Sequence, residues 1–177
     1  MTADQSITVG VFDGFSWIRC EGKGSFLNSP AVKAFGDLRI SAGEKILVVD
    51  LAACSGMDST FMGTLAGMST RLSAREQGAL QVADPGSRNL RSLEDLGLDN
   101  LMEVNPPNAP WRGGLDDIRG RLRAPGAAAP MDIHQRKRHV LESHENLSEI
   151  SGENAREFSD VVENLRKEIG ESDKPSR

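Results

Sequence analysis

A strand followed closely by the start of a helix, within residues 45–72, is the feature that most constrains how this chain folds. Residues 46–51 (ILVVDL) form an apolar run rich in β-branched side chains, which is typical of a strand buried on both faces of a sheet. A turn is expected at residues 53–57, and the polar residues 58–60 (DST) follow it. Apolar residues then recur at helical spacing: Phe61, Met62, Leu65, Met68 and Leu72. The stretch therefore predicts a strand that leads a pair of hydroxyl groups to the N-terminus of a helix.

The start of a helix has chemical properties that matter for these hydroxyl groups. Its first turn carries unpaired backbone N–H groups and the positive end of the helix dipole. An anionic group attached to Ser59 would be stabilised there. The alternative is that Asp58 or Ser59 is simply the N-cap of the helix and has no further function, because both residue types are common at that position. Spacing alone leaves these two interpretations open.

The same stretch resembles the signature of STAS domains, as found in bacterial anti-sigma factor antagonists. The features that carry the resemblance are a strand ending in Asp50 and Leu51, the run GMDST at residues 56–60, and a glycine-containing helix after it. The later segment NLRSLEDLGL at residues 89–98 also resembles the corresponding part of these domains. The similarity therefore extends beyond the motif and implies a STAS-like fold for the first part of the chain.

In that family, a partner serine kinase phosphorylates the serine directly after the aspartate of the motif, and Ser59 is the matching position. The resemblance implies Ser59 as the phosphorylated residue, with Thr60 as the fallback. It also implies two kinds of partner: a serine kinase that acts as an anti-sigma factor and binds the unphosphorylated form, and a serine phosphatase. Residues expected to contact the partner are Asp58, Ser59, Thr60, Phe61 and Met62.

The residues after the hydroxyl pair differ from the common family pattern. Many members carry Gly-Leu-Gly there, whereas Phe61, Met62 and Gly63 follow in this chain. The bulky Phe61 favours a second interpretation, in which the domain is a non-phosphorylated STAS interaction module or a subunit of a transport or signalling assembly. A small-molecule sensor built on the same fold is a third interpretation, with no specific residue to support it.

The elements on either side of this stretch predict an α/β domain with helices layered against a mixed sheet. A hairpin is expected across residues 7–20, a helix at residues 29–38, whose inner face is Val32, Phe35 and Leu38, and a strand at residues 79–83. Three further elements complete the pattern: a helix at residues 90–96, a strand at residues 101–104 and a last helical turn or two at residues 115–122. The predicted STAS-like domain spans residues 1–123.

The composition changes after this domain. Residues 124–131 form a linker rich in Ala, Pro and Gly, residues 132–169 a helical extension, and residues 170–177 a disordered tail. In the extension, residues spaced alternately by four and three form a half-polar stripe, or seam, along a predicted helix, which is typical of a docking helix or coiled coil. Two shorter helices, or a segment that folds only on binding, fit this pattern as well. The apolar seam residues expected to associate with a second copy, a partner helix or the domain itself are Leu147, Phe158, Val161 and Leu165.

Composition also excludes several kinds of partner. The chain has 21 basic and 26 acidic side chains and a net charge of −5, which argues against nucleic acid as the main partner. No stretch approaches the ~20 apolar residues that span a bilayer, so membrane insertion is not expected. Only Cys20 and Cys54 are present, without a CxxC motif or a secretory signal, which indicates a reduced, cytoplasmic protein.

No metal site, cofactor or catalytic centre is expected. His134, His139 and His144 are spaced by five residues, which on a helix turns successive rings about 140° apart rather than toward one face. No phosphate-binding loop or dinucleotide fingerprint is present. Because no histidine precedes residue 134, no base is expected beside Ser59, and the chain is interpreted as a binding protein rather than an enzyme.

Overall fold

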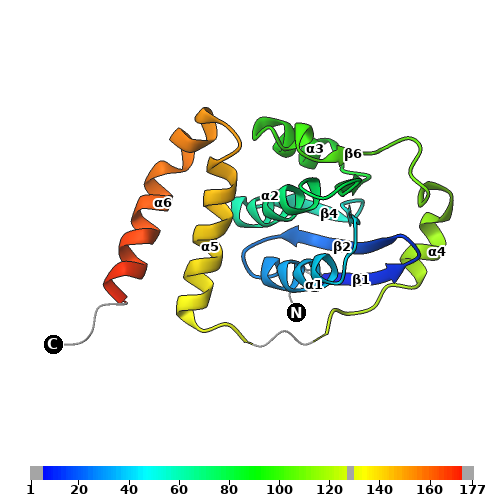
Figure 1. The fold of residues 1–177 in the computed structure, drawn as a ribbon, viewed down its shortest axis with the longest axis horizontal. Helices are drawn as coiled ribbons and strands as arrows, with labels where there is room; N and C mark the ends of the chain where they lie inside the picture. The colour runs from blue at the N-terminus through cyan, green and yellow to red at the C-terminus, as the bar shows by residue number, and fades with distance from the viewer. Residues whose placement is uncertain (1–5, 127–129, 173–177) are drawn as a thin grey trace.

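The computed structural model describes residues 6–126 and 130–172, which form one sheet surrounded by helices (Figure 1). The strands are β1 (Ser6–Phe12), β2 (Phe15–Gly24), β3 (Ile46–Asp50), β4 (Cys54–Met57), β5 (Ala79–Ala83) and β6 (Glu103–Val104). The helices are α1 (Ser29–Ser41), α2 (Ser59–Ser73), α3 (Ser87–Asp95), α4 (Leu115–Gly120), α5 (Ile133–Ser148) and α6 (Gly152–Ser172). This order of elements confirms the predicted α/β fold with a mixed sheet and a helical extension.

The sheet has the strand order β1-β2-β3-β5-β6, and β4 pairs with β2 beyond the end of β3. Strand β1 runs antiparallel to β2, and all other pairs are parallel. The predicted hairpin and the predicted strand at residues 79–83 are confirmed. The turn predicted at residues 53–57 is wrong, because Cys54–Met57 form β4. Its sequence, CSGM, lacks an apolar pattern, and it becomes a strand because β2 is long enough to offer a free edge.

Both faces of the sheet are covered. Neighbouring residues of β3 point to opposite sides, so Leu47 and Val49 join the larger apolar cluster under α1 and α2, while Val48 joins a smaller cluster on the other face. That smaller cluster contains Trp17 and Trp111 and is closed by α4. Strand β3 is therefore buried on both faces, as its sequence predicted.

Helix α1 differs from its prediction in length and facing. It runs to Ser41, beyond the predicted end at residue 38. Of the three residues predicted to face inward, Val32 is fully buried and Phe35 is partly buried against the core, but Leu38 is 66% exposed. The prediction for Leu38 was wrong because the three residues are spaced by three, whereas an α-helix has 3.6 residues per turn, so the third residue lies off the buried face.

The C-terminal extension folds back onto the domain as two helices joined by residues 149–151 (Figure 1). Helix α5 packs across α2, and α6 packs on the side of α5 that faces away from the sheet. Three of its apolar side chains join the larger core cluster: Leu147, Phe158 and Val162. We call α5 and α6 together the C-terminal hairpin.

Some details of the extension differ from the predictions. Val161 is 41% exposed and does not pack on the domain, whereas Val162 is buried there; association of Val161 with a second copy or a partner stays a prediction. Leu165 is half-buried. Helix α6 runs on to Ser172, past the predicted end at residue 169, and the rest of the predicted tail lies outside the described residues. Within the described part of the chain, no helix is both long and apolar enough to cross a membrane.

Candidate functional site

Asp58 fixes the start of α2 and ties it to the neighbouring loop. Its Oδ1 accepts a hydrogen bond from the Phe61 N–H at 2.8 Å, which makes Asp58 the N-cap. Its Oδ2 accepts another from the Phe26 N–H, also at 2.8 Å, and its own N–H donates to the Gly24 carbonyl at 2.9 Å. Ser59 is consequently held as the first residue of the helix, with a half-buried side chain.

The hydroxyl of Ser59 lies against a histidine of the C-terminal hairpin. Ser59 Oγ and His144 Nε2 are 2.8 Å apart, and His144 Nδ1 lies 2.7 Å from the Val140 carbonyl oxygen. Because a carbonyl only accepts, Nδ1 carries the proton that it donates, and Nε2 of the neutral ring is an acceptor. The Ser59 hydroxyl therefore donates to His144.

This contact contradicts the expectation that no base lies beside Ser59. The expectation was wrong because it considered only the residues before position 134, and the hairpin returns a histidine from 85 positions away. The His144 ring is buried and packs edge-on against Phe158, with ring centroids 5.5 Å apart. A backbone carbonyl rather than a carboxylate orients the ring, so the arrangement holds a hydroxyl in place without the third member of a Ser-His-Asp triad.

Only part of the predicted contact surface is accessible. Phe61 is fully buried, and Thr60 and Met62 are nearly so, because their side chains belong to the inner face of α2. The Phe61 ring packs so closely on Gly24 that a Cβ there would lie 2.8 Å from it. Of the five residues predicted to meet a partner, only Asp58 and Ser59 have partly exposed side chains.

Two exposed apolar residues lie beside the site and were not singled out from the sequence. Phe26 and Leu27 are 56% and 67% exposed, and the Asp58 carboxylate holds the backbone of this loop through the Phe26 N–H. The signal that could have identified them is an apolar pair between a strand end and a helix start, where turns are usually polar. They extend the accessible surface around Ser59.

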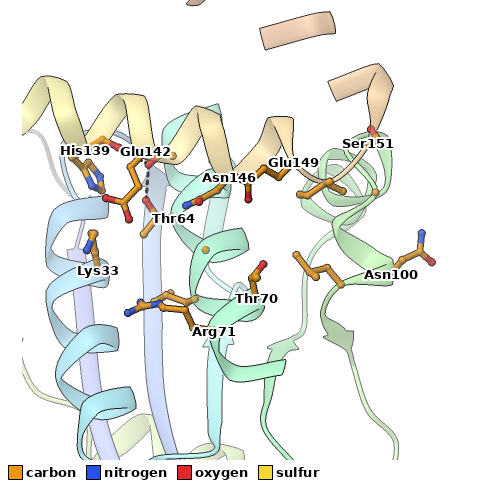
Figure 2. A pocket seen from close by; sticks show the side chains of 16 residues that line it. Lys33, Thr64, Thr70, Arg71, Asn100, His139, Glu142, Asn146, Glu149 and Ser151 are labelled. Carbon is orange, nitrogen blue, oxygen red and sulfur yellow. Dashed lines mark hydrogen bonds between the residues drawn. The ribbon is translucent and has the colours of Figure 1, made fainter. Parts of the chain in front are cut away.

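Several polar side chains join helix α5 to α1 and α2. His139 Nε2 lies 2.8 Å from Ser29 Oγ, and Ser143 Oγ lies 3.2 Å from Thr64 Oγ1, a bond drawn in Figure 2. Asn146 Nδ2 donates to the carbonyl of Gly63 at 3.2 Å. We call these contacts, together with the one between Ser59 and His144, the polar seam.

Two glycines bring the helices of the polar seam into close contact. A Cβ on Gly63 would overlap the backbone carbonyl of Ser143, and one on Gly67 would overlap the side-chain amide of Asn146. In the structure, the space at Gly63 is filled by α5 of the same chain.

A cleft of about 660 Å³ lies beside the polar seam, between α5 and helices α1 and α2 (Figure 2). Lys33 and Arg71 line it, and both pair with Asp37. Burial lowers the pKa of His139, which also lines the cleft, and the nearby Lys33 ammonium lowers it further. No group of three or more His, Cys, Asp or Glu side chains in the described residues is placed to hold a metal ion.

Asp50, at the end of β3, has a structural environment. It is fully buried and accepts hydrogen bonds from Trp17 at 3.3 Å, from Arg19 at 2.8 Å and from Arg119 at 2.8 Å. Burial by itself would raise the pKa of Asp50, but the bonds from Arg119, the Ala52 N–H and Arg19 outweigh it and lower the pKa. Asp50 therefore links α4 to the sheet as a carboxylate.

Comparison with known proteins agrees with this fold. The model of the STAS domain family matches residues 6–108, more than half of the chain. The anti-sigma factor antagonist SpoIIAA in its unphosphorylated form is 20% identical, with a TM-score of 0.50, over 65% of this chain and 99% of that chain. An anti-sigma factor antagonist from Mycobacterium paratuberculosis is 26% identical, with a TM-score of 0.53, over 67% of this chain and 99% of that chain. A search of curated proteins finds no match.

Proposed function

Because the chain belongs to the STAS domain family, we propose that it is a protein-interaction switch controlled by phosphorylation of Ser59. The observation that carries the proposal is the position of Ser59, the first residue of α2 and directly after the aspartate that caps the helix. In the unphosphorylated form, the surface around Ser59 binds a regulatory serine kinase that acts as an anti-sigma factor. Phosphorylation releases this partner, and a serine phosphatase restores binding.

The physical basis of the switch is local. A phosphate adds about −1.5 to −2 charges and three acceptor oxygens at one side chain. The positive end of the α2 dipole stabilises this charge on the domain. A partner surface shaped for a hydroxyl beside the Asp58 carboxylate meets added bulk and like charge instead. Phosphorylation therefore weakens binding through local charge and bulk.

The accessible part of the proposed contact surface consists of Asp58, Ser59, Phe26 and Leu27. The two apolar side chains are exposed, and the Asp58 carboxylate binds the backbone of their loop. Exposed apolar side chains beside a polar group are typical of a protein contact, because their burial contributes about 25 cal/mol per Å². A partner that covers them also contacts Ser59, so its binding depends on whether Ser59 is phosphorylated.

A second candidate function is a STAS interaction module that is not phosphorylated. The observation that favours it is the bond between Ser59 and His144, because it gives the serine hydroxyl a structural partner within the chain. In this function the domain binds its partner, a transport or signalling assembly, regardless of the modification of Ser59.

Partner capture with Ser59 variants separates the two functions. We expect Ser59→Ala to retain partners from an extract of the source cells and Ser59→Asp to lose at least nine tenths of them. Ser55→Asp is the matched control, because Ser55 is exposed on β4 and gains the same charge away from the helix start. If Ser59→Asp captures every partner as well as the unmodified chain does, charge at Ser59 is not the signal.

A further inference from the structure

We propose that the C-terminal hairpin is an intramolecular cover for Ser59, and that a docked hairpin and a phosphorylated Ser59 exclude each other. This inference rests on the proposed function of Ser59 and adds a regulatory step to it. The hairpin occupies the face of α1 and α2 next to the serine and contacts its hydroxyl, so a kinase has full access to the Ser59 hydroxyl only after the hairpin has left. Figure 2 shows α5 lying across this face, with His139, Thr64 and Asn146 between the helices.

The first argument is that α5 already occupies the space on its side of the Ser59 hydroxyl. Its Oγ is already in hydrogen-bond contact with His144, at 2.8 Å from Nε2. Phosphoryl transfer forms an Oγ–P bond, breaks the terminal phosphoanhydride bond of a nucleoside triphosphate on the kinase, and releases the hydroxyl proton. The product places a phosphorus atom and three oxygens where the hydroxyl now meets the imidazole. Because α5 packs directly on α2 at Gly63, a shift of α5 that makes room for the phosphate opens this contact, and the docked position is lost.

The second argument is the chemistry of the interface that has to open. Along the polar seam, hydroxyl, imidazole and amide groups form the direct contacts, and water can replace each of these hydrogen bonds when the helices separate. Three apolar side chains of the hairpin join the larger core cluster, namely Leu147, Phe158 and Val162, and of these only Leu147 is completely buried. An interface of this kind opens at a lower free-energy cost than an apolar core does.

The third argument is that the hairpin can leave as a unit. Helix α6 packs mainly on α5, and the Phe158 ring contacts the His144 ring within the hairpin. Its main polar link to the rest of the domain is Asn154, whose side-chain amide donates to the Leu96 carbonyl at 3.0 Å. Residues 124–131 connect the hairpin to the domain, so its release breaks no strand of the sheet.

Hydrogen–deuterium exchange of the full chain with phosphoserine incorporated at position 59 during synthesis tests the inference without a kinase. We expect the amides of α5 to exchange at least tenfold faster than in the unmodified chain, while the amides of β3 and β5 keep their protection. Equal protection of α5 in the two chains would overturn the inference.

Glycine variants provide a reference for the released hairpin. Gly63→Ala should release α5 without any phosphate, because the new Cβ meets the Ser143 backbone, whereas Gly170→Ala in α6 meets no atom within 4 Å and should leave exchange unchanged. Ser143→Leu makes the same test from the side of the hairpin, should Gly63→Ala disturb α2. If neither variant exposes α5, the close contact does not hold the hairpin and the inference is wrong.

A phosphorylation assay distinguishes failure of the cover from failure of the switch. In an extract of the source cells supplied with ATP, Ser59 of Gly63→Ala should be phosphorylated several-fold faster than Ser59 of the unchanged protein or of Gly170→Ala. Equal rates would overturn the cover and leave the switch intact. If no chain gains phosphate at Ser59, the proposed function fails, while the exchange experiment still decides whether phosphate and docking exclude each other.

Discussion

Replacing Leu147 by alanine tests how the hairpin is held on the domain. Leu147 is fully buried at the interface of α5 with the larger core cluster. A Leu→Ala change at such a site costs about 2–5 kcal/mol through lost burial and the cavity left behind. We take about 3 kcal/mol, which corresponds to a roughly 150-fold weaker docking equilibrium. The loss should fall on docking, because the sheet and its helices keep their other apolar contacts.

Urea unfolding followed with two probes separates docking from unfolding of the sheet. Trp17 and Trp111 are both in the smaller cluster on the far face of the sheet, so their fluorescence reports that region. Circular dichroism at 222 nm also reports the helices of the hairpin. In Leu147→Ala we expect the dichroism to fall at lower urea than in the unchanged protein, with little change in the fluorescence midpoint.

The matched control is Ile133→Ala, in the same helix but 67% exposed, which should move neither transition. If Leu147→Ala shifts both probes by the same amount, the hairpin and the sheet unfold as one cooperative unit. The reasoning that treats the hairpin as a separately released cover would then be wrong.

Three further predictions concern the residues around the site. Asp58→Ala should lower the free energy of unfolding by only ~1 kcal/mol in thermal melts, while it reduces phosphorylation or partner binding far more. Between pH 6.5 and the lowered pKa of His139, this imidazole binds a proton in the unfolded chain but not in the folded one, so acidification in this range should destabilise hairpin docking. Hydrogen exchange measured as a function of pH tests this, and His139→Gln should reduce the dependence on pH. Asp50→Asn should cost about 2 kcal/mol in urea unfolding, because it removes the carboxylate that Arg19 and Arg119 share.

The parts of the site that depend on local chemistry could be predicted from the sequence. Asp58 caps α2 and Ser59 begins it because a short acidic side chain before an apolar helical pattern satisfies the free N–H groups of the first turn. The strand at residues 79–83 was also predicted with the right bounds, because its apolar run ends at a turn of Asp, Pro and Gly. In each case the deciding interactions lie within a few residues of each other.

The position of the hairpin could not be predicted in this way, because long-range contacts decide it. The polar half of the seam predicted for residues 132–169 includes His144 and Asn154. Both are buried because they find hydrogen-bond partners elsewhere in the chain, Ser59 for the histidine and the Leu96 and Leu147 carbonyls for the asparagine. Such partners cannot be read from the spacing of one segment.

The exposure of Val161 within the chain has a related cause. The predicted seam applies one pattern of residue spacings, alternately four and three, to the whole extension, although residues 149–151 separate two helices. Each helix sets its own phase, so the inner face of α6 includes Phe158 and Val162 rather than Val161. Only a serine and a glycine mark the turn between the helices, and the apolar pattern continues across them, so the pattern gave no sign of the turn.

Phosphopeptide mapping of the protein isolated from its own cells, together with its intact mass, tests the central claim most directly. We expect a fraction of the molecules to carry a single phosphate, located on Ser59, and this fraction to change with the growth condition. Thr60 is buried and should stay unmodified in the same peptides. Molecules whose Ser59 is unmodified under every condition, with any phosphate confined to other residues, would contradict it.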